Sequence, residues 1–382
     1  MKEILFKVLS IVGTRPDTIK LAPLINELNN RIEIESYLCG SGQHREMLDQ
    51  ALRIFNLTPD IDLNVMSANQ TLDSLSSKLL EAFGKMFSEL QFDAVIVHGD
   101  TTTAFCGALS AFYHQIPVIH IEAGLRTHSI SEPFPEEFNR QAIATIAVLN
   151  FAPTETAASN LLREGVPKEK IIISGNTVID SLRIVKARIT EDSAIGEEIA
   201  STLSKYLDFN YISSDFVLVT MHRRENIGDG IIEVCEAISK LSTKFRNIKF
   251  VLPVHLNPAV GNDVKRVLAN HGNVYLLPPL PYLEFVALLS NAMLIITDSG
   301  GIQEEAVSLG KRALVTRNMT ERGEGVDTGL LEIVATDGEK IFQAARKIIK
   351  ENKQDRILSN NPYGSGNISK KIADEIIAHF KL

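Results

Sequence analysis

Cysteine is scarce in this chain of 382 residues, which contains only Cys39, Cys106 and Cys235. Their spacing matches no metal-binding pattern, and two of them lie in apolar segments, so we expect buried thiols. A small, odd number of cysteines is typical of proteins that work in a reducing cytoplasm, because disulfides persist only in oxidising compartments.

Basic charge and long apolar runs are also lacking. Lys and Arg number 39 against 47 Asp and Glu, giving a net charge of −8, which argues against a nucleic-acid surface but leaves room for a local basic pocket. No apolar run approaches the length that spans a bilayer, so no membrane partner is expected. The N-terminal segment MKEILFKVLSIVG has no small-residue cleavage site and indicates a first strand rather than a signal peptide.

Several motifs that define enzyme classes are missing from the sequence. There is no G-x-G-x-x-G after the first expected strand, which disfavours a nicotinamide site. Walker A, H-E-x-x-H, C-x-x-C and G-x-S-x-G patterns are absent too. No set of His, Asp and Glu has convincing metal-ligand spacing, so neither a metal nor a cofactor is expected.

The pattern that is present predicts an α/β protein. The chain exceeds the usual size of a single core, so two domains are expected. Short apolar runs alternate with helical patterns, which predicts two Rossmann-like, doubly wound parallel sheets covered on both faces. About five strands are expected in each domain, at Phe6–Val12, Ser36–Cys39, Ala94–Val97, Val118–Ile121 and Val148–Ala152, then Phe216–Thr220, Lys249–Val254, Val274–Leu277, Met293–Ile296 and Ala313–Val315.

The polar, helical interval between Asn176 and Asp215 predicts the boundary between the domains. We expect an N-terminal domain of residues 1–180 and a C-terminal domain of residues 181–366. A last helix, at about 367–382, is expected to pack back on the first domain.

The most informative segment is Thr297-Asp-Ser-Gly-Gly-Ile-Gln-Glu-Glu305, which lies between an expected strand and an expected helix. Its glycines would let a phosphate approach the backbone, and the N–H groups of the helix N-terminus would point at that phosphate. The two carboxylates after the turn could accept hydrogen bonds from a ribose diol. The segment therefore predicts a site for a nucleoside diphosphate, and the alternative is an ordinary turn capped by Ser299.

Ligands of doubly wound sheets bind beyond the carboxyl ends of the strands, so the polar residues that follow each strand are the candidates. In the first half, Arg15 and Lys20 supply cations, with Arg15 suited to grip a diphosphate. Asp100, Glu122 and Glu136 supply carboxylates that could exchange protons. Asp100 and Glu136 could alternatively be helix caps, whereas Glu122 and Arg126, which follow an apolar strand, are expected to face the crevice.

In the second half, His222 follows a strand and could carry a proton, with Arg223 and Arg224 beside it as anion partners. A single histidine at a strand end can equally be an ordinary satisfied polar group. One of Arg317 and Arg322, which follow the last expected strand, is expected to reach the diphosphate.

Taken together, these segments resemble the non-hydrolysing UDP-N-acetylglucosamine 2-epimerases of bacteria. Each motif is weak alone, but the ordered set is specific and runs over nearly the whole chain. The matching pieces are GTRPDTIKLAPL, SGQHREMLDQ, HGDTTTAF, HIEAGLRT, PFPEEFNR, SGNTVIDSL, HRREN, PVHLNP, DSGGIQEEA and TERGEGVDTG.

The resemblance implies a GT-B-type architecture, with the active site in the cleft between the two domains, and a cytoplasmic homodimer. It implies reversible conversion of UDP-GlcNAc to UDP-ManNAc, which supplies ManNAc for cell-surface polysaccharide. The chemistry it implies is elimination of UDP to 2-acetamidoglucal and re-addition, with no nicotinamide and no metal. The expected partners are therefore UDP-GlcNAc, UDP-ManNAc and UDP.

The resemblance also implies roles for individual residues. The catalytic group it implies is Asp100, Glu122, Glu136 and His222. The UDP-binding group is Arg15, Lys20, Phe285, Ser299, Gly300, Gly301, Glu305 and Arg322, with Glu305 on the ribose and Phe285 near the uracil. An allosteric site for a second substrate molecule is implied at Gln43, Gln70, Glu136, Arg223 and His255.

This chain departs from the family pattern at four positions. Asn69 stands where some members have Arg, which bears on the strength of activation. Asp17 replaces the commoner Glu after GTRP, and Gly323 and Gly325 replace Pro and Ala near Arg322. Three rivals stay open: a hydrolysing epimerase, a GT-B glycosyltransferase and a non-catalytic UDP-sugar sensor.

Overall fold

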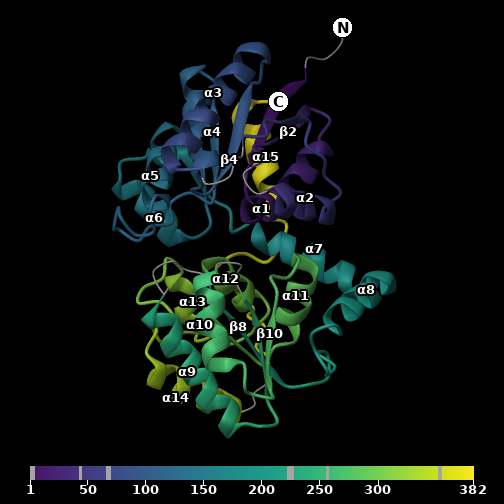
Figure 1. Ribbon diagram of the computed structural model, residues 1–382. Coiled ribbons are helices and arrows are strands. Elements are labelled where there is room, and N and C mark those ends of the chain that lie inside the picture. The colour runs from purple at the N-terminus through teal and green to yellow at the C-terminus, as the bar shows by residue number, and fades with distance from the viewer. Residues whose placement is uncertain (1–4, 43–44, 66–69, 222–227, 255–257, 352–354) are drawn as a thin grey trace. The chain divides into compact units, whose positions relative to one another are not determined.

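The computed structural model describes residues 5–42, 45–65, 70–221, 228–254, 258–351 and 355–382. The chain divides into two units (Figure 1). The first contains Met1–Ser181 and Pro362–Leu382, and the second contains Leu182–Asn361.

The first unit contains, among its described residues, a seven-stranded parallel sheet in the order β3-β2-β1-β4-β5-β6-β7. Its strands are β1 (Phe6–Val12), β2 (Ile34–Gly40), β3 (Ile61–Asp62), β4 (Ala94–His98), β5 (Val118–Ile121), β6 (Leu149–Ala152) and β7 (Ile171–Ile173). Its helices are α1 (Arg15–Asn29), α2 (Arg45–Ile54), α3 (Leu72–Glu89), α4 (Thr102–Tyr113), α5 (Glu136–Ile146), α6 (Glu155–Arg163), the start of α7 (Val178–Glu191) and α15 (Ile368–Phe380), with a 3₁₀ turn at Lys168–Lys170.

The second unit contains, in the part that the structure describes, a six-stranded parallel sheet in the order β10-β9-β8-β11-β12-β13. Its strands are β8 (Phe216–Thr220), β9 (Lys249–Pro253), β10 (Val274–Leu277), β11 (Leu294–Thr297), β12 (Ala313–Val315) and β13 (Leu331–Ile333). Its helices are the rest of α7, α8 (Ser193–Leu203), α9 (Asp229–Lys244), α10 (Pro258–Leu268), α11 (Tyr282–Asn291), α12 (Gly300–Ser308), α13 (Gly323–Asp327) and α14 (Gly338–Glu351).

The two sheets share the order of their first six strands, and this order places the switch point of each sheet. In each, the first strand lies in the middle: β1 pairs with β2 and β4, and β8 pairs with β9 and β11. The strand order reverses at that point, and the crevice beyond the carboxyl ends of these strands is where doubly wound sheets bind ligands. The residues after β1 and β4, and those after β8 and β11, therefore lie at the two switch points.

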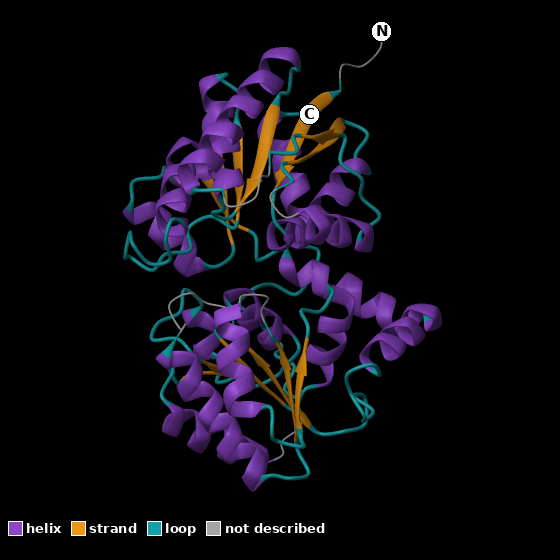
Figure 2. Ribbon diagram, in the orientation of Figure 1, coloured by secondary structure: helices purple, strands orange, loops and turns teal. Residues whose placement is uncertain are grey.

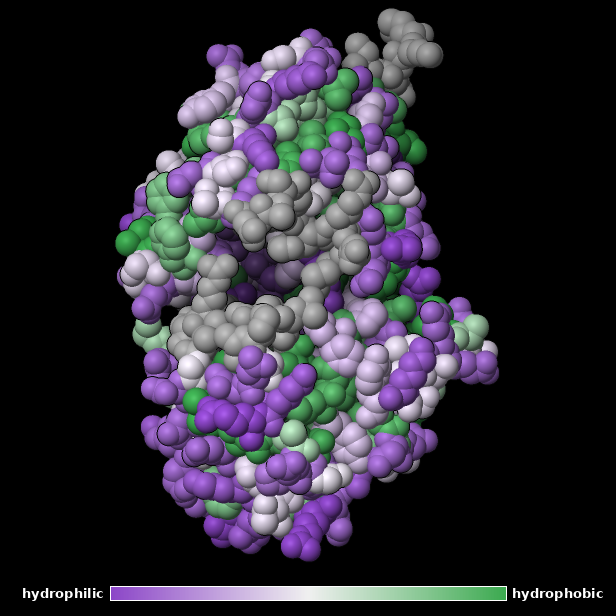
Figure 3. Space-filling view, viewed as in Figure 1, coloured by the Kyte–Doolittle hydropathy of each residue, from purple (hydrophilic) through white to green (hydrophobic). Residues whose placement is uncertain are grey.

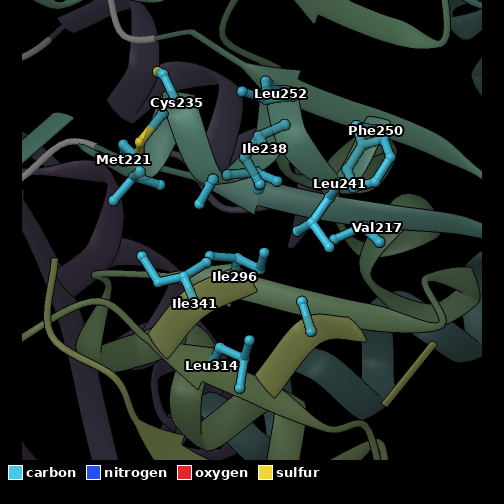
Figure 4. Packing of buried hydrophobic residues seen from close by; sticks show 14 of the residues in the cluster. Val217, Met221, Cys235, Ile238, Leu241, Phe250, Leu252, Ile296, Leu314 and Ile341 are labelled. Atoms are coloured by element: carbon cyan, nitrogen blue, oxygen red, sulfur yellow. The ribbon is translucent and has the colours of Figure 1, made fainter. Parts of the chain in front are cut away.

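Apolar side chains on the strands and helices form the core of each unit. In the second, Figure 4 shows side chains from β8, β9, β11, β12, α9 and α14 pointing toward one another. Val217, Ile238, Leu241 and Phe250 are fully buried there. Burying one such side chain contributes about 1.5 to 3 kcal/mol, so this layer stabilises the unit strongly. Figure 2 shows helices around the strands of each sheet, as two-sided burial of the strands requires.

The C-terminal helix α15 belongs to the first unit and packs against α1 (Figure 1). The Asp180 carboxylate accepts hydrogen bonds from the backbone N–H groups of Ile368, at 3.3 Å, and Ser369, at 2.6 Å. A carboxylate at a helix N-terminus satisfies orphan donors and favours the helix dipole. The end of the chain is therefore fastened to the start of α7.

The predicted fold class is confirmed, but the number of strands was too low. The structure adds β3, β7 and β13, with two or three residues each. All three are edge strands, and such short segments carry too little periodicity to be recognised in a sequence.

The surface is mixed in character, with hydrophilic residues interrupted by hydrophobic ones in both units (Figure 3). Several large hydrophobic side chains are exposed. Phe112 and Tyr113 are the last residues of α4, Phe134 precedes α5, and Phe138 lies in the first turn of α5. None of the described helices has the length and apolar character needed to cross a membrane.

Candidate active site

Glu122 is a constrained acid beside the first switch point, one strand away from it in the sheet. It follows β5 directly and adopts the left-handed conformation, with φ of 61°, which is uncommon for a residue with a side chain and stores on the order of 1 kcal/mol of strain. Its side chain is 8% exposed. Oε2 accepts hydrogen bonds from the ammonium group of Lys20 and from Nδ2 of Asn176, the latter at 2.6 Å. Such donors favour the ionised form of a carboxyl group.

His98, the last residue of β4, lies against this carboxylate. Its Nε2 is 3.9 Å from Oε2 of Glu122 and makes no hydrogen bond among the described residues. Burial lowers the pKa of His98 to about 4, although the nearby carboxylates of Glu122 and Asp100 oppose that shift. The imidazole is therefore neutral at physiological pH. Sequence reasoning assigned His98 no role, because a histidine at a strand end gives no signal of what faces it.

Asp100 lies two residues after β4, at the entrance to α4. The guanidinium of Arg140 donates from Nη2 to Oδ2 of Asp100, and Asn139 donates from Nδ2 to the Asp100 carbonyl oxygen at 2.8 Å. The Asp100 side chain is 26% exposed, much more than that of Glu122. Helix α5 thus holds this carboxylate in place, while leaving it accessible.

The two neighbouring acids of α5 differ in their surroundings. Glu136 is the first residue of the helix and is half-buried. Glu137 is fully buried, where its Oε2 lies 3.3 Å from Nη1 of Arg140 and accepts the backbone N–H of Thr127 at 3.2 Å. Glu137 is therefore structural in character, whereas Glu136 is accessible to a ligand.

Lys20 and Arg15 both lie on α1, but their surroundings differ. Lys20 was expected to be a second cation for the diphosphate, but its ammonium group forms an ion pair with Glu122, which competes with that role. Arg15 is the first residue of the helix and is half-buried. Its position is fixed by Asp17, whose carboxylate accepts the backbone N–H groups of Gly13, at 3.1 Å, and Thr14, at 2.8 Å. Burial raises the pKa of Asp17 to about 6, against the pull of these hydrogen bonds.

Arg126 does not belong to this site, contrary to the expectation from the sequence. Its Nε and Nη2 donate to the two carboxylate oxygens of Glu164, at 2.8 and 2.7 Å. The side chain is fully buried in this bidentate pair. A residue five positions after a strand end has already turned away from the switch point, which sequence spacing alone does not reveal.

At the second switch point, β11 is followed by Asp298 and then by α12, which begins at Gly300. Ser299 occupies the N-cap without a side-chain cap hydrogen bond, and its own N–H donates to Oγ1 of Thr297 at 3.0 Å. A methyl group built on Gly301 would meet nothing within 4 Å. Among the described residues, the space beside Gly301 at the start of α12 is thus open, and an anion could approach the helix there.

Arg322 lies directly over this turn. Its Nε donates to Oε1 of Glu304 at 3.1 Å, and Nη1 donates to Oε2 of Glu321 at 3.2 Å. A methyl group on Gly300 would come within 2.8 Å of the guanidinium carbon, so the absence of a side chain is needed there. Burial by itself would raise the pKa of Glu321, but Arg322 and Arg317 together hold it well below its ordinary value. Arg317 is paired with Glu321 at 2.8 Å.

Glu305 and Phe285, the residues expected at the nucleoside, come from neighbouring elements. Oε1 of Glu305 accepts the hydroxyl of Tyr282 at 2.7 Å. Tyr282 begins α11, three residues before the half-buried Phe285, so the two share one side of that helix. Tyr282 was not predicted from the sequence, since an aromatic residue at a helix start is usually core.

Of the remaining predicted residues, Gln70 is described, and its Nε2 donates to the Val65 carbonyl oxygen at 3.2 Å. The others, Gln43, His222, Arg223, Arg224 and His255, lie outside the described residues.

The chain is similar in sequence and in structure to known proteins of one family. A family model described as UDP-N-acetylglucosamine 2-epimerase matches residues 26–377. An enzyme of that name from Campylobacter jejuni is 44% identical over 373 residues, which cover 97% of each chain.

Two solved structures are also similar. One is a UDP-GlcNAc 2-epimerase from Neisseria meningitidis bound to UDP-GlcNAc, with 42% identity, a TM-score of 0.92 and coverage of 98% of this chain and 100% of that one. The other, from Methanocaldococcus jannaschii, was solved with UDP-GlcNAc and UDP, with 31% identity, a TM-score of 0.85 and the same coverage.

Proposed function

Because this chain belongs to the UDP-N-acetylglucosamine 2-epimerase family, we propose that it interconverts UDP-GlcNAc and UDP-ManNAc by elimination and re-addition of UDP. The C2 proton is removed, the bond between C1 and the diphosphate oxygen breaks, and its electron pair leaves with UDP. A C1–C2 double bond forms, giving 2-acetamidoglucal. Re-addition of UDP to C1, with a proton delivered to the other face of C2, yields the epimer.

The carboxylates of the first unit are suited to the proton transfers. Glu122 is held rigidly by Lys20 and Asn176, and Asp100 by Arg140. A fixed, ionised carboxylate can accept a proton, and a nearby accessible acid can return one. Glu136 joins them at the start of α5, and His222 completes the catalytic group on the strength of the resemblance.

The second unit is suited to hold the leaving group. The open start of α12 at Ser299, Gly300 and Gly301, together with Arg322, would stabilise the negative charge that accumulates on the departing diphosphate. Arg15 of the first unit is proposed to contribute a further guanidinium. Glu305, oriented by Tyr282, would accept the ribose hydroxyls, and Phe285 would lie near the uracil.

The observation that carries this proposal is the surroundings of Glu122, a nearly buried carboxylate beside a switch point that pairs with the ammonium of Lys20 and accepts a hydrogen bond from Asn176. Proton NMR of UDP-GlcNAc incubated with the protein in D2O tests the proposal. We expect UDP-ManNAc to appear with deuterium at C2. Free ManNAc would indicate a hydrolysing enzyme, and UDP release only on addition of an acceptor would indicate a glycosyltransferase. Untouched UDP-GlcNAc with protium at C2 would leave only a binding role.

We also propose, from the resemblance, allosteric activation by a second UDP-GlcNAc at Gln43, Gln70, Glu136, Arg223 and His255. The test measures the initial rate as a function of UDP-GlcNAc concentration, and activation predicts a sigmoidal curve. A hyperbolic dependence on substrate concentration, in both directions of the reaction, would contradict the proposed activation.

A homodimer that acts in the cytoplasm is proposed as well. Two aromatic residues at the end of α4, Phe112 and Tyr113, are exposed at 51% and 67% and offer apolar surface. Cys39, Cys106 and Cys235 are buried free thiols, as expected for a reducing compartment. Light scattering at micromolar concentration gives the oligomeric state, and a monomer would contradict the proposed homodimer.

A further inference from the structure

Asn176 lies in the loop after β7 and is 1% exposed. Its Oδ1 accepts the backbone N–H of Val178 at 3.1 Å, which caps α7. Because the oxygen is committed to a donor, the amide nitrogen must point the other way, and it donates to Oε2 of Glu122 at 2.6 Å. The orientation of the amide is thus fixed by its hydrogen bonds, with no freedom to flip.

The backbone of Asn176 is fixed too. Its N–H donates to the carbonyl oxygen of Tyr363 at 2.9 Å, and Tyr363 is the largest fully buried side chain. Four residues on, Asp180 binds the start of α15. The C-terminal segment that begins at Pro362 is therefore connected to Glu122 through Asn176, whose backbone binds Tyr363 and whose side chain binds Glu122.

The two oxygens of Glu122 have different surroundings. Lys20 of α1 and Asn176 both donate to Oε2, and His98 of β4 faces the same oxygen at 3.9 Å. Oε1 lies over Gly99, where even a methyl group would come only to within 3.5 Å of it. Two donors from different elements thus hold Oε2.

We propose that Asn176 is a positioning residue that fixes Oε2 of Glu122, the carboxylate proposed to exchange a proton with the sugar. This inference rests on the proposed epimerase function. It goes beyond that function by giving a role to a residue of the SGNTVIDSL segment. It also gives the C-terminal segment a link to the catalytic carboxylate.

The variant Asn176→Asp separates this role from simple capping. Aspartate caps a helix as well as asparagine does, so a purely structural role predicts a variant that behaves like wild type at every pH. When protonated, the introduced carboxyl group can donate to Glu122 and still accept the Val178 N–H. When ionised, it places a second negative charge against Oε2, and two adjacent carboxylates then compete for one proton.

The experiment measures kcat and KM of wild type and Asn176→Asp for UDP-GlcNAc between pH 5 and pH 9. We expect the ratio of the two kcat values to be near one at the acidic end. It should fall about tenfold per pH unit once the shared proton is lost, with little change in KM. A ratio that stays constant across the range would overturn the proposal. A wild type without epimerase activity would instead refute the proposed function.

Two further variants keep the test decisive if Asn176→Asp does not fold. Asn176→Ser keeps a cap for α7 but is too short to reach Glu122, so kcat should fall about tenfold at every pH. A kcat within twofold of wild type would contradict the proposal. Asp180→Asn is the matched control: it weakens the attachment of α15 without touching Glu122, and it should lower the melting temperature while leaving the pH profile unchanged.

Discussion

The two sheets of this protein share one strand order, yet their switch points differ in chemistry. At the first, acids follow the strands, and each acid is held by a cation: Glu122 by Lys20 and Asp100 by Arg140. At the second, glycines follow the strand, and the nearby cation Arg322 is held by acids. One switch point is suited to move protons, and the other to bind an anion.

The comparison shows that topology fixes where a site lies but not what the site does. Both positions arise from the same reversal of strand order. The difference comes from a few side chains, so substitutions that act on one switch point alone should separate chemistry from binding.

The largest effect is expected for Glu122→Gln. Glutamine keeps the shape of the side chain but cannot accept the C2 proton, so kcat should fall on the order of 10²- to 10⁴-fold. The affinity for UDP should stay near that of wild type, because the second unit is unchanged. Calorimetric titration with UDP and a turnover assay measure both quantities. Asp100→Asn should behave in the same way, and turnover at the wild-type rate in both variants would remove these acids from the mechanism.

Arg140 and Arg126 provide a matched pair of buried arginines in the first unit. Arg140→Met releases Asp100 and also removes the cation beside the buried Glu137. The misplaced Asp100 carboxylate should lower the kcat of the folded protein on the order of 10²-fold. Arg126→Met releases Glu164, which is one-third exposed and can be solvated. It should lower the free energy of unfolding by about 1 to 3 kcal/mol and leave kcat unchanged. Turnover assays and urea unfolding compare the two. Equal loss of kcat would show that both arginines are merely structural.

Gly301→Ala probes the second switch point. The added methyl group meets open space, and alanine favours a helix over glycine, so stability should be unchanged or slightly higher. If a phosphate approaches this backbone, the affinity for UDP should fall about tenfold, as a lost charge-assisted hydrogen bond implies. Gly272→Ala, which also meets open space, is the control and should bind UDP normally. Unchanged affinity in Gly301→Ala would move the phosphate away from α12.

The smallest effect concerns pH and His120, whose Nε2 lies 2.8 Å from the carbonyl oxygen of Gly99. Burial lowers the pKa of His120 to about 4 from 6.5. Below pH 6.5 the unfolded state therefore takes up a proton that the folded state refuses, and the free energy of unfolding falls as the pH drops toward 4. The loss should reach about 2 to 3 kcal/mol for this residue.

His120→Gln keeps a donor for Gly99 but cannot titrate, so it should lack this loss. Denaturant unfolding at pH 7 and pH 4.5 gives the comparison. Asp17, whose pKa is raised to about 6, acts in the opposite sense, but it is common to both proteins and cancels. An identical pH dependence in the two proteins would show that His120 is not held neutral.

Much of this fold could be predicted from the sequence, because buried parallel strands leave continuous apolar runs. Phe6–Val12, Val118–Ile121 and Phe216–Thr220 have the predicted bounds. The turn at Ser299 was located from its glycines, and Asp100 and Glu122 from their places after strands. Helix α1 begins at Arg15, because Thr14 and Asp17 form a capping box and Pro16 lies in the first turn.

The contacts that give the site its character could not be predicted. Lys20 meets Glu122 from 102 positions away, and Asn176 meets it from 54. The sequence does not show which acid each buried arginine contacts: Arg126 pairs with Glu164, and Arg140 pairs with Asp100. Pairing across a sheet edge depends on the exact direction of each loop, and residue type and spacing do not encode that direction.

The most direct test of the division between the two switch points is the rate of deuterium entry at C2 of UDP-GlcNAc at saturating substrate. For Glu122→Gln we predict no measurable exchange although the substrate is bound, whereas Gly301→Ala should keep measurable exchange once saturated. Exchange at the wild-type rate in Glu122→Gln would contradict the account.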